Sequence, residues 1–405
     1  MTTVRPPHQG SENHTARPER ESSAAVIAVR RLFGSDSADY MIVLGTTVFL
    51  VIFGLVMVLS SSSIVSSQSN DGDFFAVFLR QGLFALIGIP VMLMVARLPA
   101  RFWRRWARAA VMLGLGLQLL VFTGLGYDYG GNQNWISLGG FTAQPSEFLK
   151  LALVVWLGTV LADRADAFTD WQSLLVPAVP VSVLAIGMVL AGQDLGTASI
   201  MVAIVLGALF YAGAPLLRLG VLALAVLAGG IVFALSSSSR SSRISVWING
   251  CRPEDYEGFC WQVVHGTWAL GSGGVLGVGL GNSASKWSWL PHAESDFIFA
   301  VIGEELGLVG ASVVLVLYAV LAVGLIRIIR RHRDPFARIV TGAVLVWIVG
   351  QAFVNVAVVL GLLPVLGVPL PLISAGGSAL VASLLGIGVV LSLARAAEAR
   401  AASER

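Results

Sequence analysis

Charge and cysteine are both scarce in this sequence. Charged residues make up 12% of the 405 positions, hydrophobic residues make up 56%, and only two cysteines are present. This composition excludes an ordinary soluble globular domain and is typical of a membrane protein. The formal net charge of +3 is too small to indicate nucleic acid as a partner. The polar start of the chain has no early apolar segment, which excludes a cleavable signal peptide.

Apolar runs long enough to cross a bilayer recur along the chain. We predict an all-α polytopic membrane protein with about ten transmembrane helices. Residues 1–39 are expected to form a disordered cytoplasmic tail, residues 40–395 the transmembrane domain, and residues 396–405 a cytoplasmic C-terminal tail. The helices are expected near residues 40–60, 75–96, 109–126, 147–162, 172–192, 196–214, 219–235, 297–326, 338–361 and 371–394.

The basic residues are unevenly distributed between these helices. Most of the 26 Lys and Arg residues lie in the N-terminal tail, in the connections after the second and eighth helices, and at the C-terminus. The positive-inside rule therefore predicts that both termini are cytoplasmic. One large outward loop is then expected at residues 236–296, between the seventh and eighth helices.

Several features of the predicted outward loop have more than one interpretation. Its serine-rich start, SSSSRSSRISVW, is either flexible or a contact for phosphate, and residues 259–276 are expected to form a re-entrant or interfacial helix. Cys251 and Cys260 favour a disulfide over a metal site if the loop faces an oxidising compartment. The glycine-rich run 271–281 follows no strand, which argues against a nucleotide site.

Two acidic residues stand out at the start of the eighth helix. In a continuous helix Glu304 would lie about 80° round from Asp296 and roughly 12 Å deeper, whereas Glu305 would lie about 180° round. Asp296 and Glu304 are therefore expected to border one cavity, and carboxylates at membrane depth are costly enough to suggest function. The simpler interpretation of Asp296 is a helix N-cap, which its spacing alone favours.

Other polar residues gather toward the same side of the membrane. Glu147 and Lys150 share a helix face and could neutralise each other. Asp194 lies in a short turn between two helices, and Gln351 and Asn355 could form interhelical hydrogen bonds. Scattered structural pairs would not need to gather at one side, so we favour one shared polar site.

Five sequence blocks resemble the SEDS family (shape, elongation, division and sporulation) over about residues 40 to 395. The ending of the last block and the long N-terminal tail are more similar to the division member of the family than to the elongation member. The blocks are Asn134-Trp135-Ile136, QPSEFLK from Gln144 to Lys150, DLGT from Asp194 to Thr197, SDFIFAVIGEE from Ser295 to Glu305, and PLPLISAGGS from Pro369 to Ser378.

The resemblance implies a peptidoglycan glycosyltransferase that polymerises lipid II into glycan strands at the division septum of the bacterial cytoplasmic membrane. Its implied partners are a class B penicillin-binding protein and other divisome membrane proteins. Asp296 matches the essential loop aspartate and would act as the general base. The leaving pyrophosphate would need a cation, for which Lys150, Arg80, Arg243 or a divalent ion (Mg or Mn) are the candidates. Other expected substrate-binding residues are Trp135, Glu147, Lys150, Arg80, Asp194, Arg243 and Glu304.

Two blocks depart from the common family pattern. Asn132-Gln133-Asn134 lacks a cation often found before the Trp-Ile pair, and the acidic and imidazole groups of His292 and Glu294 are exchanged. A lipid II flippase, an elongation-type polymerase and a structural scaffold are the alternatives. A flippase would need its site exposed to each leaflet in turn, whereas the polar residues here gather on one side. A scaffold would leave the intramembrane carboxylates without a purpose.

Overall fold

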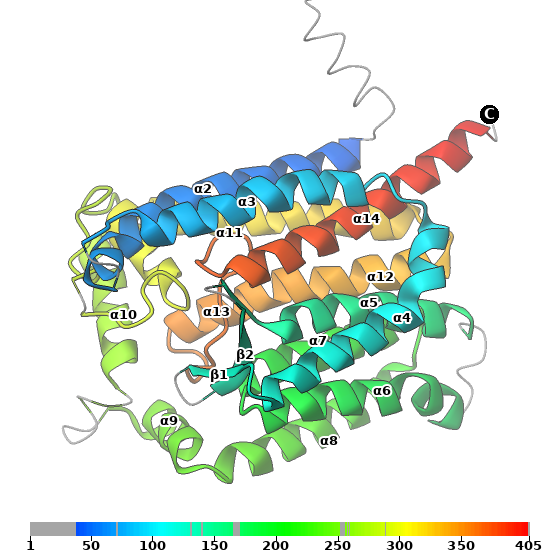
Figure 1. Ribbon diagram of the computed structural model, residues 1–405, viewed down its shortest axis with the longest axis horizontal. Coiled ribbons are helices and arrows are strands. Elements are labelled where there is room, and N and C mark those ends of the chain that lie inside the picture. Colours follow the sequence, from blue (N-terminus) through cyan, green and yellow to red (C-terminus); the bar gives the residue numbers. More distant parts are fainter. Residues whose placement is uncertain are drawn as a thin grey trace, which may run out of the picture. The chain divides into compact units, whose positions relative to one another are not determined.

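A computed structural model describes residues 38–69, 72–129, 132–138, 141–164, 171–251, 256, 258, 260–287 and 289–403. The tail predicted at residues 1–39 lies outside these residues except for its last two positions, which begin the first described helix. Long apolar helices dominate the described chain (Figure 1). They are α2 (Ala38–Ser69), α3 (Ala76–Val95), α4 (Ala100–Leu119), α5 (Pro145–Ala162), α6 (Trp171–Ala191), α7 (Leu195–Ala212), α8 (Leu216–Leu235), α11 (Ile298–Arg331), α12 (Pro335–Leu345), α13 (Gln351–Val359) and α14 (Gly377–Ser403).

The predicted all-α membrane fold is confirmed. Within the described residues, nine helices are long and apolar enough to span a membrane, with α12 and α13 forming one span at Pro335–Val359. The expected fifth span corresponds to α6, whose described apolar stretch is the shorter Ala178–Ala191. One boundary differs, because α14 continues to Ser403 and the tail predicted at residues 396–405 begins inside that helix.

The helix ends follow from local sequence. The Asp194 carboxylate accepts a hydrogen bond from the Thr197 amide and caps α7, which ends at Gly213 in the left-handed conformation. Asp334 caps α12 in the same way, with Pro335 at the first helical position. Residues Val346–Gly350 form a π-helical turn between α12 and α13. Such turns occur frequently at functional sites.

The bundle is built from helix pairs that are distant in sequence. α14 packs against α3, α11 against α2, and α12 against both α5 and α7. α5 is largely enclosed, with buried side chains on every face. By contrast, α8 packs chiefly against α7 and α9, and Ala234 is its one buried side chain among those described.

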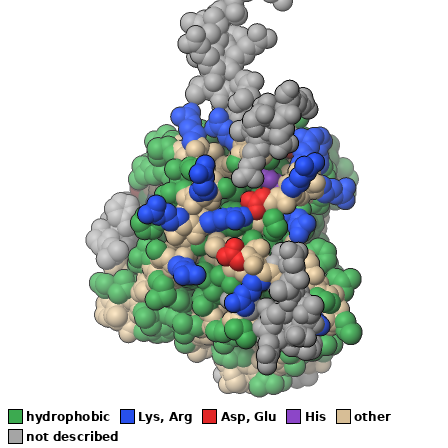
Figure 2. Space-filling view, turned by 90° about the vertical axis from the view of Figure 1, so that its right-hand side faces the viewer, with side chains coloured by type: hydrophobic (Ala, Val, Ile, Leu, Met, Phe, Trp, Pro, Cys, Tyr) green, Lys and Arg blue, Asp and Glu red, His purple; other side chains and the backbone are tan. Residues whose placement is uncertain are grey.

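The two ends of the bundle carry different chemistry. Figure 2 shows Lys and Arg side chains gathered at the end that contains the start of α4 and the end of α11. There Asp39 is buried and forms ion pairs of 2.7 Å with both Arg327 and Arg331. Figure 1 places the short helices α9 (Ser238–Asn249) and α10 (Trp261–Gly273) at the other end. This separation of basic residues matches the charge asymmetry of the sequence.

The long connection between α8 and α11 is more regular than its sequence suggested. The serine-rich start, which could have been flexible, forms most of α9. α10 occupies the region expected to form a re-entrant or interfacial helix. The connection therefore holds its side chains in fixed positions at one end of the bundle.

A small antiparallel sheet follows α4 and was not predicted. The expected helix 109–126 in fact begins at Ala100 and gives way to β1 (Gly126–Tyr129), β2 (Asn132–Leu138) and β3 (Phe141–Ala143), in that order across the sheet. The helix starts earlier because its first turns are amphipathic and rich in Arg, which a search for apolar runs misses. In the sheet, Tyr127 pairs with Trp135.

α11 is interrupted at Gly307, which adopts φ 67°. The amides of Val278 and Gly279 donate to the carbonyls of Glu304 and Glu305, and the Leu308 amide donates to Gly274. A side chain at Gly273 or Gly277 would collide with this backbone. The glycine-rich run is therefore explained by close backbone approach to a broken helix, not by a ligand.

Candidate functional site

Asp296 lies in the loop before α11 and does not cap the helix. Phe297 occupies the N-cap position, and no side chain caps this end. The N-cap interpretation of Asp296 is therefore wrong. Instead, Asn355 holds the backbone of Asp296 in place. The Asn355 side-chain amide donates to the Asp296 carbonyl at 2.7 Å and to the Val368 carbonyl at 2.7 Å.

The rest of this loop is fixed by the Pro369–Ser378 block. The Ser374 hydroxyl donates to the Ser295 carbonyl at 2.6 Å, and the Ala375 amide donates to the Glu294 carbonyl at 2.9 Å. Gln81 of α3 donates to the Ser374 carbonyl at 3.0 Å. Two blocks of the family pattern are thus joined by hydrogen bonds that leave the Asp296 carboxylate available.

Backbone strain concentrates around this loop. Among the described residues, the non-glycine positions with positive φ are Gln193 (68°), His292 (59°) and Leu372 (67°). Each belongs to a segment that meets the site: the turn before Asp194, the loop before Asp296, and the block that holds that loop. Such conformations persist only where the surrounding structure imposes them, and they cluster at functional sites.

The environment of Asp296 favours proton transfer near neutral pH. Burial raises the pKa of its half-buried carboxyl to about 6, with further upward contributions from Glu294 and Asp194. His292 and Arg243 oppose this by favouring the carboxylate. A carboxylate with this pKa is a stronger base than an exposed aspartate.

A cavity of about 390 Å³, here called the tryptophan cavity, lies on one side of Asp296. Trp135 of β2 and Arg80 of α3 line it, so two of the predicted substrate-binding residues are brought together. Residues that directly precede Asp296 line it as well. Its polar and aromatic lining consists of Arg80, Gln81, Tyr127, Trp135, His292, Glu294 and Ser295.

A second cavity of about 190 Å³, here called the arginine cavity, is lined by residues of α7, α9 and the segment 364–366. It contains two further predicted residues, Asp194 at the start of α7 and Arg243 of α9, together with Arg240. Besides capping α7, Asp194 accepts a hydrogen bond of 3.0 Å from Gln144, and burial raises its pKa. Because Asp194 and Arg243 both shift the pKa of Asp296, this cavity is electrostatically coupled to the loop aspartate.

Glu147 and Lys150 line neither of these cavities. Both side chains are buried and form an ion pair of 2.9 Å inside the bundle. Lys150 also donates to Gln351 at 3.1 Å, and Gln351 donates to the Pro369 carbonyl at 2.9 Å. The expectation that Lys150 contacts pyrophosphate is therefore not met in this arrangement; the pair is neutralised and supports the Pro369–Ser378 block.

Glu304 lines neither of the two cavities described above. Its buried carboxylate accepts hydrogen bonds from the Ser283 hydroxyl at 2.5 Å and the Ala284 amide at 2.9 Å. The Ser60 hydroxyl of α2 donates to the Glu305 carboxylate and lies 2.6 Å and 2.7 Å from its two oxygens. Glu304 therefore anchors the loop that follows the glycine-rich run instead of contacting substrate.

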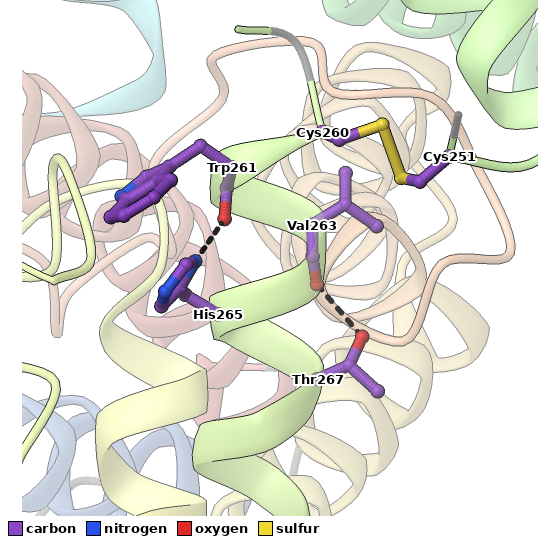
Figure 3. The surroundings of a disulfide bond; sticks show 6 residues. All are labelled: Cys251, Cys260, Trp261, Val263, His265 and Thr267. Carbon is purple, nitrogen blue, oxygen red and sulfur yellow. Dashed lines mark hydrogen bonds between the residues drawn. A yellow bond between two sulfur atoms is a disulfide. The ribbon is translucent and has the colours of Figure 1, made fainter. Parts of the chain in front are cut away.

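Cys251 and Cys260 form a disulfide that joins the end of α9 to the start of α10 (Figure 3). On the first turns of α10, the Trp261 and His265 rings stack with centroids 4.0 Å apart. The indole of Trp289 lies parallel to that of Trp261, with 6.1 Å between centroids. The disulfide thus ties the end of α9, the helix that carries Arg240 and Arg243, to the start of α10.

No metal centre is found among the residues that the structure describes. No group of three or more His, Cys, Asp or Glu side chains in this part of the chain is placed to hold an ion. The divalent cation expected from the resemblance stays a prediction, and no step below is routed through it.

Arg240 was not among the predicted substrate-binding residues, although it lies in the serine-rich segment that was considered a contact for phosphate. It lies one helical turn before Arg243, so both side chains point to the same face of α9 and reach the same cavity. The spacing was visible in the serine-rich segment, but no helix was expected there. Asn355 was predicted to form interhelical hydrogen bonds, but its contact with the Asp296 carbonyl joins segments far apart in sequence.

Comparisons with known proteins agree with this arrangement. The probable peptidoglycan glycosyltransferase FtsW of Mycobacterium tuberculosis is 38% identical over 391 residues, which cover 95% of this chain and 74% of that protein. Stage V sporulation protein E of Bacillus subtilis is 36% identical over 360 residues, which cover 89% of this chain and 97% of that protein.

Solved structures show the same fold. One chain comes from a structure described as the structural coordination of polymerization and crosslinking by a peptidoglycan synthase complex. It has a TM-score of 0.72 and 26% identity, and the match covers 88% of this chain and 97% of that one. The rod shape determining protein RodA of Thermus thermophilus has a TM-score of 0.64 and 25% identity, with 87% and 95% covered.

A family model described as cell cycle protein, named for FtsW, RodA and SpoVE, matches residues 40–399. This match spans most of the chain and agrees with the relatives and with the solved structures. The resemblance seen in the five sequence blocks is confirmed, and the chain belongs to the SEDS family of FtsW, RodA and SpoVE.

Proposed function

We propose that this chain is a peptidoglycan glycosyltransferase that polymerises lipid II into glycan strands, with Asp296 as its general base. The observation that carries the proposal is the position of Asp296. Hydrogen bonds hold its loop, residues just before it line the tryptophan cavity, and burial raises the pKa of its carboxyl to about 6. The names of the FtsW relatives support the same activity.

In the proposed reaction, the Asp296 carboxylate takes the proton from the 4-hydroxyl of the acceptor sugar. The oxygen of that hydroxyl forms a bond with the anomeric carbon of the donor. The bond from this carbon to the diphosphate oxygen breaks, and undecaprenyl pyrophosphate leaves with the electron pair. Trp135 and Arg80 flank the sugars in the tryptophan cavity. His292 and Ser295, which lie shortly before Asp296 in the chain, line the same cavity.

The proposal places the chain in the bacterial cytoplasmic membrane at the division septum, with both termini cytoplasmic. The gathering of Arg at one end of the bundle and of the cavities near the other supports this orientation. The proposed partners are a class B penicillin-binding protein and other divisome membrane proteins. One similar solved chain belongs to a peptidoglycan synthase complex, which supports the first of these.

A lipid II flippase is the main alternative function. It would need a polar path open to each side of the membrane in turn, whereas both cavities lie near the loops that surround Asp296. An elongation-type role differs from the division role in partner and location rather than in chemistry. The stronger resemblance to FtsW supports the division role.

The proposal is tested with purified full-length protein and lipid II, with and without its transpeptidase. We expect glycan strands on gels when both proteins are present. In the same liposomes, transfer of lipid II between leaflets is measured with an impermeant label. Transfer without any polymer in either condition would identify a flippase and reject the proposal.

The pH dependence should report the carboxyl of Asp296. Because the base must be deprotonated, we expect kcat/KM to fall as the pH drops through about 6. His292→Asn removes a charge that lowers the pKa of Asp296, so the midpoint should move to higher pH. Asn is chosen because it tolerates the positive φ of this position.

Glu294→Gln is the matched variant for this measurement. It removes a negative charge that raises the pKa of Asp296, so the midpoint should move to lower pH. Polymerisation rates are measured across the pH range for both variants. If both midpoints move in the same direction, or if neither moves, a group other than Asp296 controls the fall of kcat/KM at acidic pH.

A further inference from the structure

We propose that the arginine cavity binds the diphosphate of the prenyl-linked donor, through Arg240 and Arg243, and that α8 guides its prenyl chain. The inference rests on the proposed function and names the cations that its leaving group requires. Sequence interpretation offered Lys150, Arg80 and Arg243 for this role. The structure separates these candidates, because Lys150 is paired inside the bundle and Arg80 lines the tryptophan cavity.

The first argument is that the guanidinium of Arg240 is buried and has unpaired donors. The Nε and Nη1 atoms of Arg240 are shielded from solvent and have no hydrogen-bond acceptor among the described residues. The guanidinium stacks over Phe233 at the end of α8, 4.1 Å from the ring centroid, which fixes its plane. Buried donors without an acceptor are costly, and an oxyanion ligand would satisfy them.

The second argument is the placement of Arg243. It lies one turn along α9 from Arg240 and lines the same cavity. It also shares an electrostatic interaction with Asp296. A leaving diphosphate held here would therefore lie beside the base that drives the reaction. Two arginines with several donors each suit a ligand with two linked phosphates.

The third argument is the contribution of α8. Ala234, near its end, lines the cavity, while most of the helix faces away from the bundle. Leu224, Ile231 and Leu235 are exposed and lie within about 40° of one another around the helix axis. Ala234 lies about 60° round the helix from Ile231, so the exposed apolar surface of α8 ends beside the cavity. A charged cavity at the end of an apolar stripe fits a lipid diphosphate better than a soluble one.

Asp194 is the acidic group in the cavity, and its contacts are compatible with an anion nearby. One carboxylate oxygen caps α7, and the other accepts a hydrogen bond from Gln144. Both oxygens are thus occupied by donors of the protein. The two guanidinium groups therefore remain available for a ligand.

The test measures binding of inorganic pyrophosphate and of farnesyl diphosphate to the purified full chain in detergent, by isothermal titration calorimetry. We expect Arg240→Gln and Arg243→Gln each to weaken farnesyl diphosphate binding about tenfold or more. Arg218→Gln, near the other end of α8, is the matched control and should bind normally. Arg240→Lys keeps the charge and should bind with intermediate affinity.

Several outcomes would overturn the inference. Unchanged binding in both Gln variants, or an equal loss in Arg218→Gln, would reject the arginine cavity. If only Arg80→Gln strongly weakens farnesyl diphosphate binding, the diphosphate binds in the tryptophan cavity instead. If inorganic pyrophosphate binds as tightly as farnesyl diphosphate, the role of α8 is wrong.

Asp296→Asn separates this inference from the proposed function. This variant should bind farnesyl diphosphate at least as tightly as the wild type, because it removes a negative charge that interacts with Arg243. Wild-type polymerisation by Asp296→Asn would reject the general base while leaving the binding result intact. Loss of polymerisation with unchanged diphosphate binding in both arginine variants would reject only the diphosphate site.

Discussion

Asp296→Asn is expected to abolish glycan polymerisation while leaving the fold intact. The amide has nearly the shape of the carboxylate but cannot accept the proton of the attacking hydroxyl. Loss of a general base typically costs about 10²- to 10⁴-fold in rate. The structure makes this test sharper, since Asp296 is not the N-cap of α11 and its carbonyl, which Asn355 holds, is unchanged by the substitution.

The measurement is the rate of strand formation from lipid II by the variant with its transpeptidase. Asp163→Asn, an exposed position at the end of α5, is the matched control and should polymerise normally. Retained thermal stability of Asp296→Asn in detergent shows that the loss is chemical. A variant that polymerises at the wild-type rate would refute the assignment of Asp296 as the base.

Lys150→Met should produce the second large effect, on stability. It leaves Glu147 buried without its partner, and breaking a buried ion pair in this way costs about 3–5 kcal/mol of unfolding free energy. The double variant Glu147→Gln with Lys150→Met removes both charges and should recover most of this loss. Unfolding is followed in detergent by heating or by a denaturing detergent.

Activity of the double variant decides what Lys150 does. If the pair only supports the Pro369–Ser378 block, as its contacts with Gln351 indicate, polymerisation should return together with stability. A stable double variant that makes no glycan would mean that Lys150 contacts the substrate after all. Double-variant analysis is appropriate because the two side chains are in direct contact.

The sequence predicted the transmembrane helices well because their signal is local. Runs of apolar residues identify spans regardless of what packs against them, and the order of the five blocks identified the family. The sheet after α4 was missed because its strands are short and polar. The first turns of α4 were missed because their apolar residues alternate with Arg.

The site was predicted less completely because its geometry depends on contacts between distant segments. Asp296 was identified by the family pattern, whereas helical periodicity assigned it a capping role that the structure does not support. The same periodicity placed Glu304 and Asp296 beside one cavity. That prediction assumed one continuous helix through both residues, whereas Asp296 lies in the loop before α11. The serine-rich segment was expected to be flexible or to contact phosphate, and only the helical form of α9 shows that Arg240 and Arg243 share one cavity.

The break in α11 has a consequence for how substitutions in this chain would be tolerated. At Gly273, Gly277 and Gly307 a side chain would collide with neighbouring backbone, and the positive φ of Gly277 and Gly307 adds strain. A saturation mutagenesis survey would therefore rank these glycines among the most restricted positions, close to Asp296 itself. Such restriction would reflect the space between two backbones, and intolerance alone would be a poor guide to which residues touch the substrate.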